Sequence, residues 1–326
     1  MAVVGIAATF GAPTWLLAQG TSAPPTTETV QLQTSDGIQL QAVYYPAGGG
    51  KASAASPLPQ AAPAAPIAIL LHDLGGSNAS VSRLAVGLQQ RGIAVIAPDL
   101  RGHGASASGG TGAGSGLEAR SLKRADFEAM TQSRGGRVRQ QATVRGDVEA
   151  IREWIKSMAD RGVLDMKRLF VIGSGVGAAV AAAWTAEDAA WPDIASGPQG
   201  RDVRGLVMIS PAWTTRGFSI APSLATDVVR RTVPILVIAG TKDKDAVRLF
   251  EQLRRARPAE WYEKRADQKD PTPNPKKDPK APATLFLLEL PTSDQADALA
   301  VSPGGPSGDV AGLIADFIIS RPPASG

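Results

Sequence analysis

The chain has 326 residues, of which 43% are hydrophobic, which is enough for one large α/β domain with a sizeable core. It contains no cysteine, which excludes a disulfide framework, a zinc-thiolate site and a cysteine nucleophile. The net charge of +4 combines 34 basic with 30 acidic residues, and no aromatic side chains interleave with the basic clusters, so we do not expect a nucleic-acid partner.

The N-terminal segment is apolar up to Ala18 and then becomes polar and rich in proline. Small residues around Ala18 suit signal cleavage, so we expect residues 1–23 to be a leader and the protein to be exported, to the periplasm or beyond the cell. No Lys or Arg precedes Lys51, so the usual positive start of a leader is missing, and a cytoplasmic protein is the alternative. Pro13 and the neighbouring glycines argue against a transmembrane span.

Two early segments, Glu28–Thr34 and Ile38–Tyr45, alternate apolar with polar residues around the turn sequence SDG, which predicts a β-hairpin. Two other stretches have compositions that cannot contribute to a core. They are the Ala/Pro/Gly-rich 46–66 and the Lys/Asp/Pro-rich 262–282. We interpret both as flexible insertions in a single domain that spans 28–322.

The middle of the chain alternates short, continuously apolar runs with segments of helical spacing. Strands without alternation, joined by helices, predict a parallel sheet covered on both faces. We therefore expect an α/β fold with a mostly parallel eight-stranded sheet that begins with the antiparallel hairpin. The six further strands are expected at Ile67–His72, Ile93–Pro98, Arg168–Gly173, Gly205–Ser210, Val233–Gly240 and Ala283–Pro291.

Three segments at the ends of these strands carry recognisable motifs: HDLGGSN (72–78), PDLRGHGASAS (98–108) and RLFVIGSGVGAAVAAAW (168–184). Together they resemble the α/β-hydrolase fold, whose members often have an oxyanion loop, a D-x-R-G-H-G-x-S loop and a G-x-S-x-G nucleophile elbow. The second motif is matched in full and is the most specific. The resemblance implies a serine esterase or peptidase ancestry for almost the whole chain.

The elbow departs from the family pattern at its central position. Aligned on the outer glycines, Gly173 and Gly177, the tip is Gly175, so the position that the resemblance assigns to the nucleophile has no side chain. Ser174 is a candidate nucleophile one residue earlier. Centring the turn on Ser174 places bulky residues where the turn requires small ones, and its hydroxyl would point elsewhere.

The resemblance also implies an acid after the seventh strand and a histidine after the last one. Asp243, with Asp245 as the second choice, matches the acid position, whereas Gln295 or its neighbour Asp294 stands where the histidine belongs. The chain has only two histidines, and both precede the elbow. We therefore expect a hydrolase-fold protein that has lost catalysis and serves in binding or assembly. An active carboxylic-ester hydrolase with a rearranged site that uses Ser174 is the alternative.

The loops nearest the elbow supply further candidates. Backbone N–H groups near Asp73, Leu74 and Val176 match the oxyanion positions, although the position of Asp73 is commonly glycine and a carboxylate there opposes oxyanion binding.

Four polar residues of the first two loops are candidates for the lining of a pocket. They are His72, His103, Asp99 and Arg101.

A minor alternative is that the turn Gly173–Ala178 binds a dinucleotide through its G-x-G-x-x-A pattern. The following strand ends in Ser210 and Pro211 rather than in an acid for the ribose, so the fingerprint is incomplete. Two histidines on separate loops and no cysteine leave little for a metal site. We expect neither a cofactor nor a metal, and the ligand or protein partner stays open.

Overall fold

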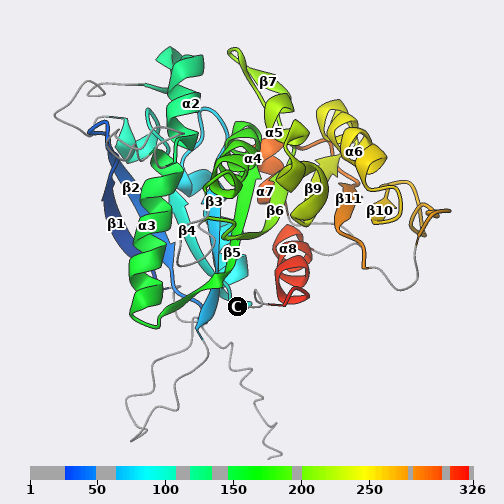
Figure 1. Ribbon diagram of the computed structural model, residues 1–326, viewed down its shortest axis with the longest axis horizontal. Helices are drawn as coiled ribbons and strands as arrows, with labels where there is room; N and C mark the ends of the chain where they lie inside the picture. Colours follow the sequence, from blue (N-terminus) through cyan, green and yellow to red (C-terminus); the bar gives the residue numbers. More distant parts are fainter. Residues whose placement is uncertain are drawn as a thin grey trace, which may run out of the picture.

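The central feature is a nine-stranded sheet with the order β1-β2-β4-β3-β5-β6-β9-β11-β10 (Figure 1). The computed structural model describes residues 26–48, 64–107, 118–133, 146–192, 200–277, 282–302 and 309–322. The expected leader, 1–23, lies outside them and stays a prediction, as does most of the expected insertion 46–66. The strands are β1 (Glu28–Gln33), β2 (Gln39–Tyr45), β3 (Ala65–Leu71), β4 (Ala94–Pro98), β5 (Leu164–Ser174), β6 (Val203–Ile209), β9 (Ile235–Gly240), β10 (Trp261–Lys264) and β11 (Leu285–Leu290).

The pairing directions agree with the expected fold. β1 pairs with β2, and β2 with β4, in antiparallel register, whereas all the remaining neighbours are parallel. A separate two-stranded hairpin, β7 (Thr214–Thr215) with β8 (Phe218–Ser219), follows β6. The fold is thus the predicted mostly parallel sheet with an N-terminal antiparallel hairpin.

Helices cover both faces of the sheet, which explains why its strands are continuously apolar. In β3, Ile67 and Ile69 belong to one buried cluster and Ala68 and Leu70 to the other, so successive side chains enter opposite cores. One face carries α1 (Ser82–Gln89), α7 (Ala296–Ala300) and α8 (Val310–Ile319); the other carries α2 (Arg124–Thr131), α3 (Asp147–Asp160), α4 (Val176–Ala189), α5 (Ala221–Ala225) and α6 (Lys244–Ala256). Within the described ranges, no helix is long and apolar enough to cross a membrane.

The ninth strand, β10, corrects the sequence interpretation, because it forms the start of the segment expected as the insertion 262–282. Trp261 and Glu263 are buried, and β10 pairs in parallel with β11 at the sheet edge. The buried Glu263 carboxylate accepts a hydrogen bond from Arg265 Nε at 2.5 Å. The chain then folds back, and Thr272 N–H donates to the Glu263 carbonyl at 2.8 Å. The sequence analysis missed this short strand because the residues that follow it, along the edge of the sheet, are polar.

Candidate functional site

The sharp turn between β5 and α4 has the conformation of a nucleophile elbow. Its tip, Gly175, has φ 54° and ψ −117°, which lies in a region that residues with a Cβ rarely adopt. The Gly175 N–H donates to the Ile209 carbonyl at 2.9 Å, and the Ala212 N–H donates to the Gly175 carbonyl at 3.1 Å. These bonds hold the tip against the end of β6, so the backbone geometry of the elbow is retained without a nucleophile side chain.

The outer glycines of the elbow are required by close backbone packing. A Cβ on Gly173 would lie 2.3 Å from the Gly177 carbonyl oxygen, and a Cβ on Gly177 would lie 2.5 Å from the His72 carbonyl oxygen. Both distances are shorter than real Cβ contacts. The match of these glycines to the G-x-S-x-G pattern therefore reflects the same packing constraint, which supports Gly175 as the centre of the turn.

The space above the elbow tip is filled by the side chain of Asp73. A Cβ on Gly175 would lie 2.1 Å from Asp73 Oδ1 and 2.3 Å from its Cγ. The same Oδ1 accepts a hydrogen bond of 2.7 Å from the N–H of Val176, the first residue of α4. The carboxylate thus fills the space in which a side chain at position 175 would lie, and it binds the Val176 N–H, a donor that the resemblance assigns to an oxyanion site.

Asp73 is held from behind by a second carboxylate that sequence reasoning missed. The Asp73 N–H donates to Asp297 Oδ1 at 2.9 Å, and Ser80 Oγ donates to Asp297 Oδ2 at 2.5 Å. Burial raises the pKa of Asp73 above its ordinary value and the Asp297 charge raises it further, while the N–H groups of Val176 and Leu74 act in the opposite direction. Asp297 lies two residues after Gln295, so its place in the expected site loop was the available signal.

Ser174, the candidate nucleophile, is not presented to solvent or to a substrate. Its side chain is completely buried, and its Oγ has no hydrogen-bond partner in the described part of the chain. It is the last residue of β5 and pairs with Ile209 of β6. No imidazole activates the hydroxyl, so the geometry does not support the rearranged hydrolase site.

Asp243, which the resemblance assigns to the acid position, has a serine as its side-chain partner. Asp243 is buried, and its Oδ1 caps α6 by accepting from the Ala246 N–H at 2.9 Å. Its Oδ2 accepts a hydrogen bond from Ser210 Oγ. Ser210 has φ 47°, an uncommon backbone conformation for a residue with a side chain. Asp245, the second choice for the acid, accepts from the Trp213 N–H at 3.1 Å.

The three positions to which the resemblance assigns a catalytic triad lie around one cavity. Gly175, Asp243 and Gln295 all line a cavity of about 510 Å³, which also contacts Asp73 and Leu74. Gln295 is exposed and precedes α7 as its N-terminal cap residue. The structure therefore brings together three residues from distant parts of the chain, with a glycine, an acid and an amide in the three places.

Neither histidine is available as a general base, because both rings are fully engaged within the core. His72 Nε2 accepts from the Leu100 N–H at 3.1 Å, which leaves Nδ1 to donate to the Asp73 carbonyl at 2.7 Å. His103 Nε2 accepts from the Gly75 N–H at 3.0 Å, and its Nδ1 donates to the Arg101 carbonyl at 3.0 Å. These hydrogen bonds tie the loop after β3 to the loop after β4.

This histidine arrangement predicts a loss of stability in mild acid. Burial lowers the pKa of His72 from 6.5 to about 4. Between these values the unfolded chain binds a proton that the folded chain excludes, so the contribution is complete above pH 6.5 and is lost by pH 4. We expect about 3 kcal/mol less unfolding free energy at pH 4 from this group.

Denaturant unfolding at several pH values, with His72→Gln as the comparison, measures that contribution. Because the chain has only two histidines, NMR titration of the ring protons can follow each ring separately. A His72 ring that titrates near pH 6.5 in the folded protein would contradict the assignment.

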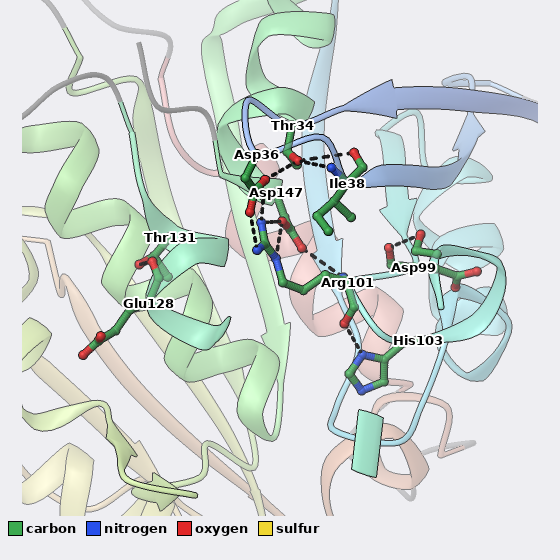
Figure 2. A network of polar contacts seen from close by, with 10 residues as sticks. Thr34, Asp36, Ile38, Asp99, Arg101, His103, Glu128, Thr131 and Asp147 are labelled. Carbon is green, nitrogen blue, oxygen red and sulfur yellow. Dashed lines mark hydrogen bonds and ion pairs between the residues drawn. The ribbon is translucent and has the colours of Figure 1, made fainter. Parts of the chain in front are cut away.

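Asp99 and Arg101 act as internal ties and do not line the cavity at the elbow. Figure 2 shows the Arg101 guanidinium between Asp36 and Asp147, with Nη1 2.7 Å from Asp36 Oδ2 and Nε 2.9 Å from Asp147 Oδ1. Asp99 accepts from the N–H groups of Asn78 and Ala105, at 2.7 and 2.8 Å.

The expectation of four pocket residues in these loops is therefore corrected. Arg101 ties the β1–β2 turn to the start of α3, and Asp99 joins the loops that follow β3 and β4. All four candidates are buried. They shape the loops that bear the site, because their polar groups are already satisfied by partners inside the protein.

A comparison with protein families finds a match over more than half of the chain. The model of the family described as "Serine aminopeptidase, S33" matches residues 62–265. No curated protein matches the sequence.

Solved structures show the same fold at low sequence identity. The esterase Pf2001 of Pyrococcus furiosus is 15% identical with a TM-score of 0.53, covering 91% of this chain and 93% of that one. EstE1, a carboxylesterase cloned from a metagenomic library, is 14% identical with a TM-score of 0.53, covering 92% and 91%. A Rhizomucor miehei esterase is 13% identical with a TM-score of 0.53, covering 90% and 84%. These similarities establish the fold.

Proposed function

Because the chain belongs to the serine aminopeptidase S33 family of α/β-hydrolase proteins, yet has glycine at the tip of its elbow, we propose that it has lost serine-hydrolase catalysis and binds a ligand or partner at the former active site. The observation that carries this proposal is the Asp73 carboxylate above Gly175. It fills the nucleophile position and engages the Val176 N–H.

Acyl transfer needs a nucleophile, a general base and an oxyanion site, and the geometry supports none of the three. No hydroxyl stands at the tip, no imidazole reaches the cavity, and the oxyanion donor is bound to a negative charge that repels another oxyanion. Loss of the nucleophile or the base alone costs serine hydrolases about a million-fold in turnover. A surviving oxyanion site would support only about a thousand-fold over water, and here that site is occupied.

The dinucleotide alternative is disfavoured by the same contact. A pyrophosphate at this turn would need the N–H groups at the start of α4 and the open space above the middle glycine. The Asp73 carboxylate takes both, and its charge opposes that of a phosphate.

Labelling with a fluorophosphonate probe, followed by mass-spectrometric mapping and assays on short-chain aryl esters, tests the proposal. We expect no adduct and no turnover from protein that unfolds cooperatively, with an active serine esterase as the positive control. Ser174→Ala and Ser210→Ala identify the site of any adduct, because Ser174 adjoins the elbow tip and Ser210 lines the cavity. A stoichiometric adduct that either variant abolishes would show that catalysis survives.

A further inference from the structure

A groove of about 420 Å³ lies between α8 and the strands β10 and β11. It shares no lining residue with the cavity at the elbow, so it is a separate place on the molecule. Its volume falls within the usual range for small-molecule sites, about 300–1,000 Å³. Its walls are mainly apolar, and they include Leu236, Tyr262, Phe286, Leu288, Leu313 and Phe317.

The groove exists because the two faces of β11 are covered to different extents. Leu287 is fully buried in the core cluster on the α6 side, whereas Phe286 and Leu288 on the opposite side are only half-buried. The Phe286 ring lies 6.0 Å from the Phe317 ring and 6.0 Å from the Tyr262 ring. These side chains leave apolar surface in contact with water, and an apolar ligand would cover it.

Arg321 places a cation on the wall of this groove. Its guanidinium carbon lies 3.6 Å from the centre of the Phe317 ring, and its Nη1 donates to the Phe317 carbonyl and to Ser320 Oγ. Its Nε is shielded from solvent and has no acceptor, and Arg321 forms no ion pair in the described part of the chain. Burial lowers the pKa of Arg321 to about 10, so the group is still charged at neutral pH.

Two arginines with fully buried side chains show how the protein otherwise satisfies this group. Arg101 lies between the carboxylates of Asp36 and Asp147. Arg257 has no carboxylate, but its Nε, Nη1 and Nη2 all donate to backbone carbonyl groups. Arg321 has neither arrangement, and the face of an aromatic ring supplies no acceptor in the plane of its N–H groups. Its charge and its remaining donors therefore match an acceptor from outside the chain.

The other charged groups of the groove leave the balance in favour of an anion. The Glu289 carboxylate is paired with Arg265 Nη1 at 3.2 Å. Asp316 is exposed, so water and salt screen its charge. Lys264 is half-buried and, among the described residues, its ammonium group has no ion-pair partner, so it adds a second cation to the walls.

We propose that this groove binds an apolar monocarboxylate, with its carboxylate on the Arg321 guanidinium and its hydrocarbon part against Phe286 and Leu288. A carboxylate is the anion that a guanidinium holds best, because two parallel N–H groups can donate to its two oxygens. The inference goes beyond the proposed function, since it concerns a different cavity and holds whether or not a ligand binds at the elbow.

Calorimetric titration with octanoate tests the site, with octanol and octylamine as analogues that keep the chain and change the head group. We expect octanoate to saturate at one molecule per chain and to bind about tenfold or more tightly than either analogue. Shortening the acid to hexanoate and then to butyrate should weaken binding about fourfold for each methylene group removed.

Two variants separate the head-group contact from the apolar contact. Arg321→Gln should weaken octanoate binding about tenfold or more and leave octanol unaffected, because only the charged head group contacts this residue. Leu288→Gln should weaken octanoate and octanol by similar factors. Arg161→Gln, which changes an exposed arginine that follows α3 on the other face of the sheet, is the matched control and should change neither. Urea unfolding of each variant verifies that it is folded.

Three results would each overturn the inference. They are no binding of octanoate, octanol or octylamine binding as tightly as octanoate, and an unchanged octanoate affinity in R321Q. The last result also covers binding of octanoate in the cavity at the elbow, which Arg321 does not line.

Discussion

Replacing Gly175 by alanine is expected to lower the free energy of unfolding by about 3 kcal/mol. One part of this cost is backbone strain, because φ 54° is unfavourable for a residue with a Cβ. The larger part is the clash of the new methyl group with the Asp73 carboxylate, whose Oδ1 lies 2.1 Å from the ideal Cβ position. Urea unfolding of the two proteins measures the difference.

Two controls separate the clash from the strain. Gly162 has a similarly positive φ of 77°, and an added methyl group there would have nothing within 4 Å, so Gly162→Ala should cost only the strain, about 1 kcal/mol. In the D73G background the clash is absent, and Gly175→Ala should there cost about as little as Gly162→Ala. If G175A costs the same with and without Asp73, the carboxylate does not occupy the elbow tip in solution.

Replacing Arg101 by methionine is expected to lower the free energy of unfolding by about 3–5 kcal/mol. The Arg101 side chain is 4% exposed and Asp147 is 0% exposed, and Nη2 of the arginine lies 2.6 Å from Asp147 Oδ1. Methionine leaves that buried carboxylate without its cation and also releases Asp36 from the contact at 2.7 Å. Denaturant unfolding at neutral pH measures the loss.

A surface ion pair provides the matched comparison for Arg101. Arg91 pairs with Asp309 at 3.0 Å, with side chains 36% and 44% exposed, so Arg91→Met should cost less than about 1 kcal/mol. Asp36→Asn should also have a small effect, because the Asp36 side chain is 46% exposed. Equal losses for R101M and R91M would show that burial of the Asp147 pair contributes nothing.

The positions of eight of the nine strands and the mostly parallel character of the sheet follow from the sequence alone. Continuous apolar runs predicted β3, β4, β5, β6, β9 and β11, because strands covered on both faces need apolar side chains in both directions. The carboxyl ends of parallel strands share one edge of a sheet, so the loops with Gly175, Asp243 and Gln295 were expected to meet there. They do line one cavity. That position 175 holds glycine and that no histidine follows it are properties of residue identity and need no coordinates.

Other features depend on contacts between residues far apart in the chain, which no local pattern encodes. β10 was missed because its four residues precede a polar segment, and only pairing with β11 makes it a strand. Four side chains that were expected to line the pocket are buried instead, because each forms a hydrogen bond to another segment of the chain. They are His72, His103, Asp99 and Arg101.

What the sequence determined by itself is therefore the fold and the residue types that stand at the elbow and in the loops around it, since apolar periodicity and residue identity are local quantities. What only the tertiary structure decided is which group lies above the tip of the elbow. The placement of Asp73 depends on the distance between two loops 103 positions apart and on the N–H of Val176, which turns a mismatched residue in the oxyanion loop into the group that fills the site. Such a contact arises from packing in three dimensions, and a residue pattern along one strand or loop cannot specify it.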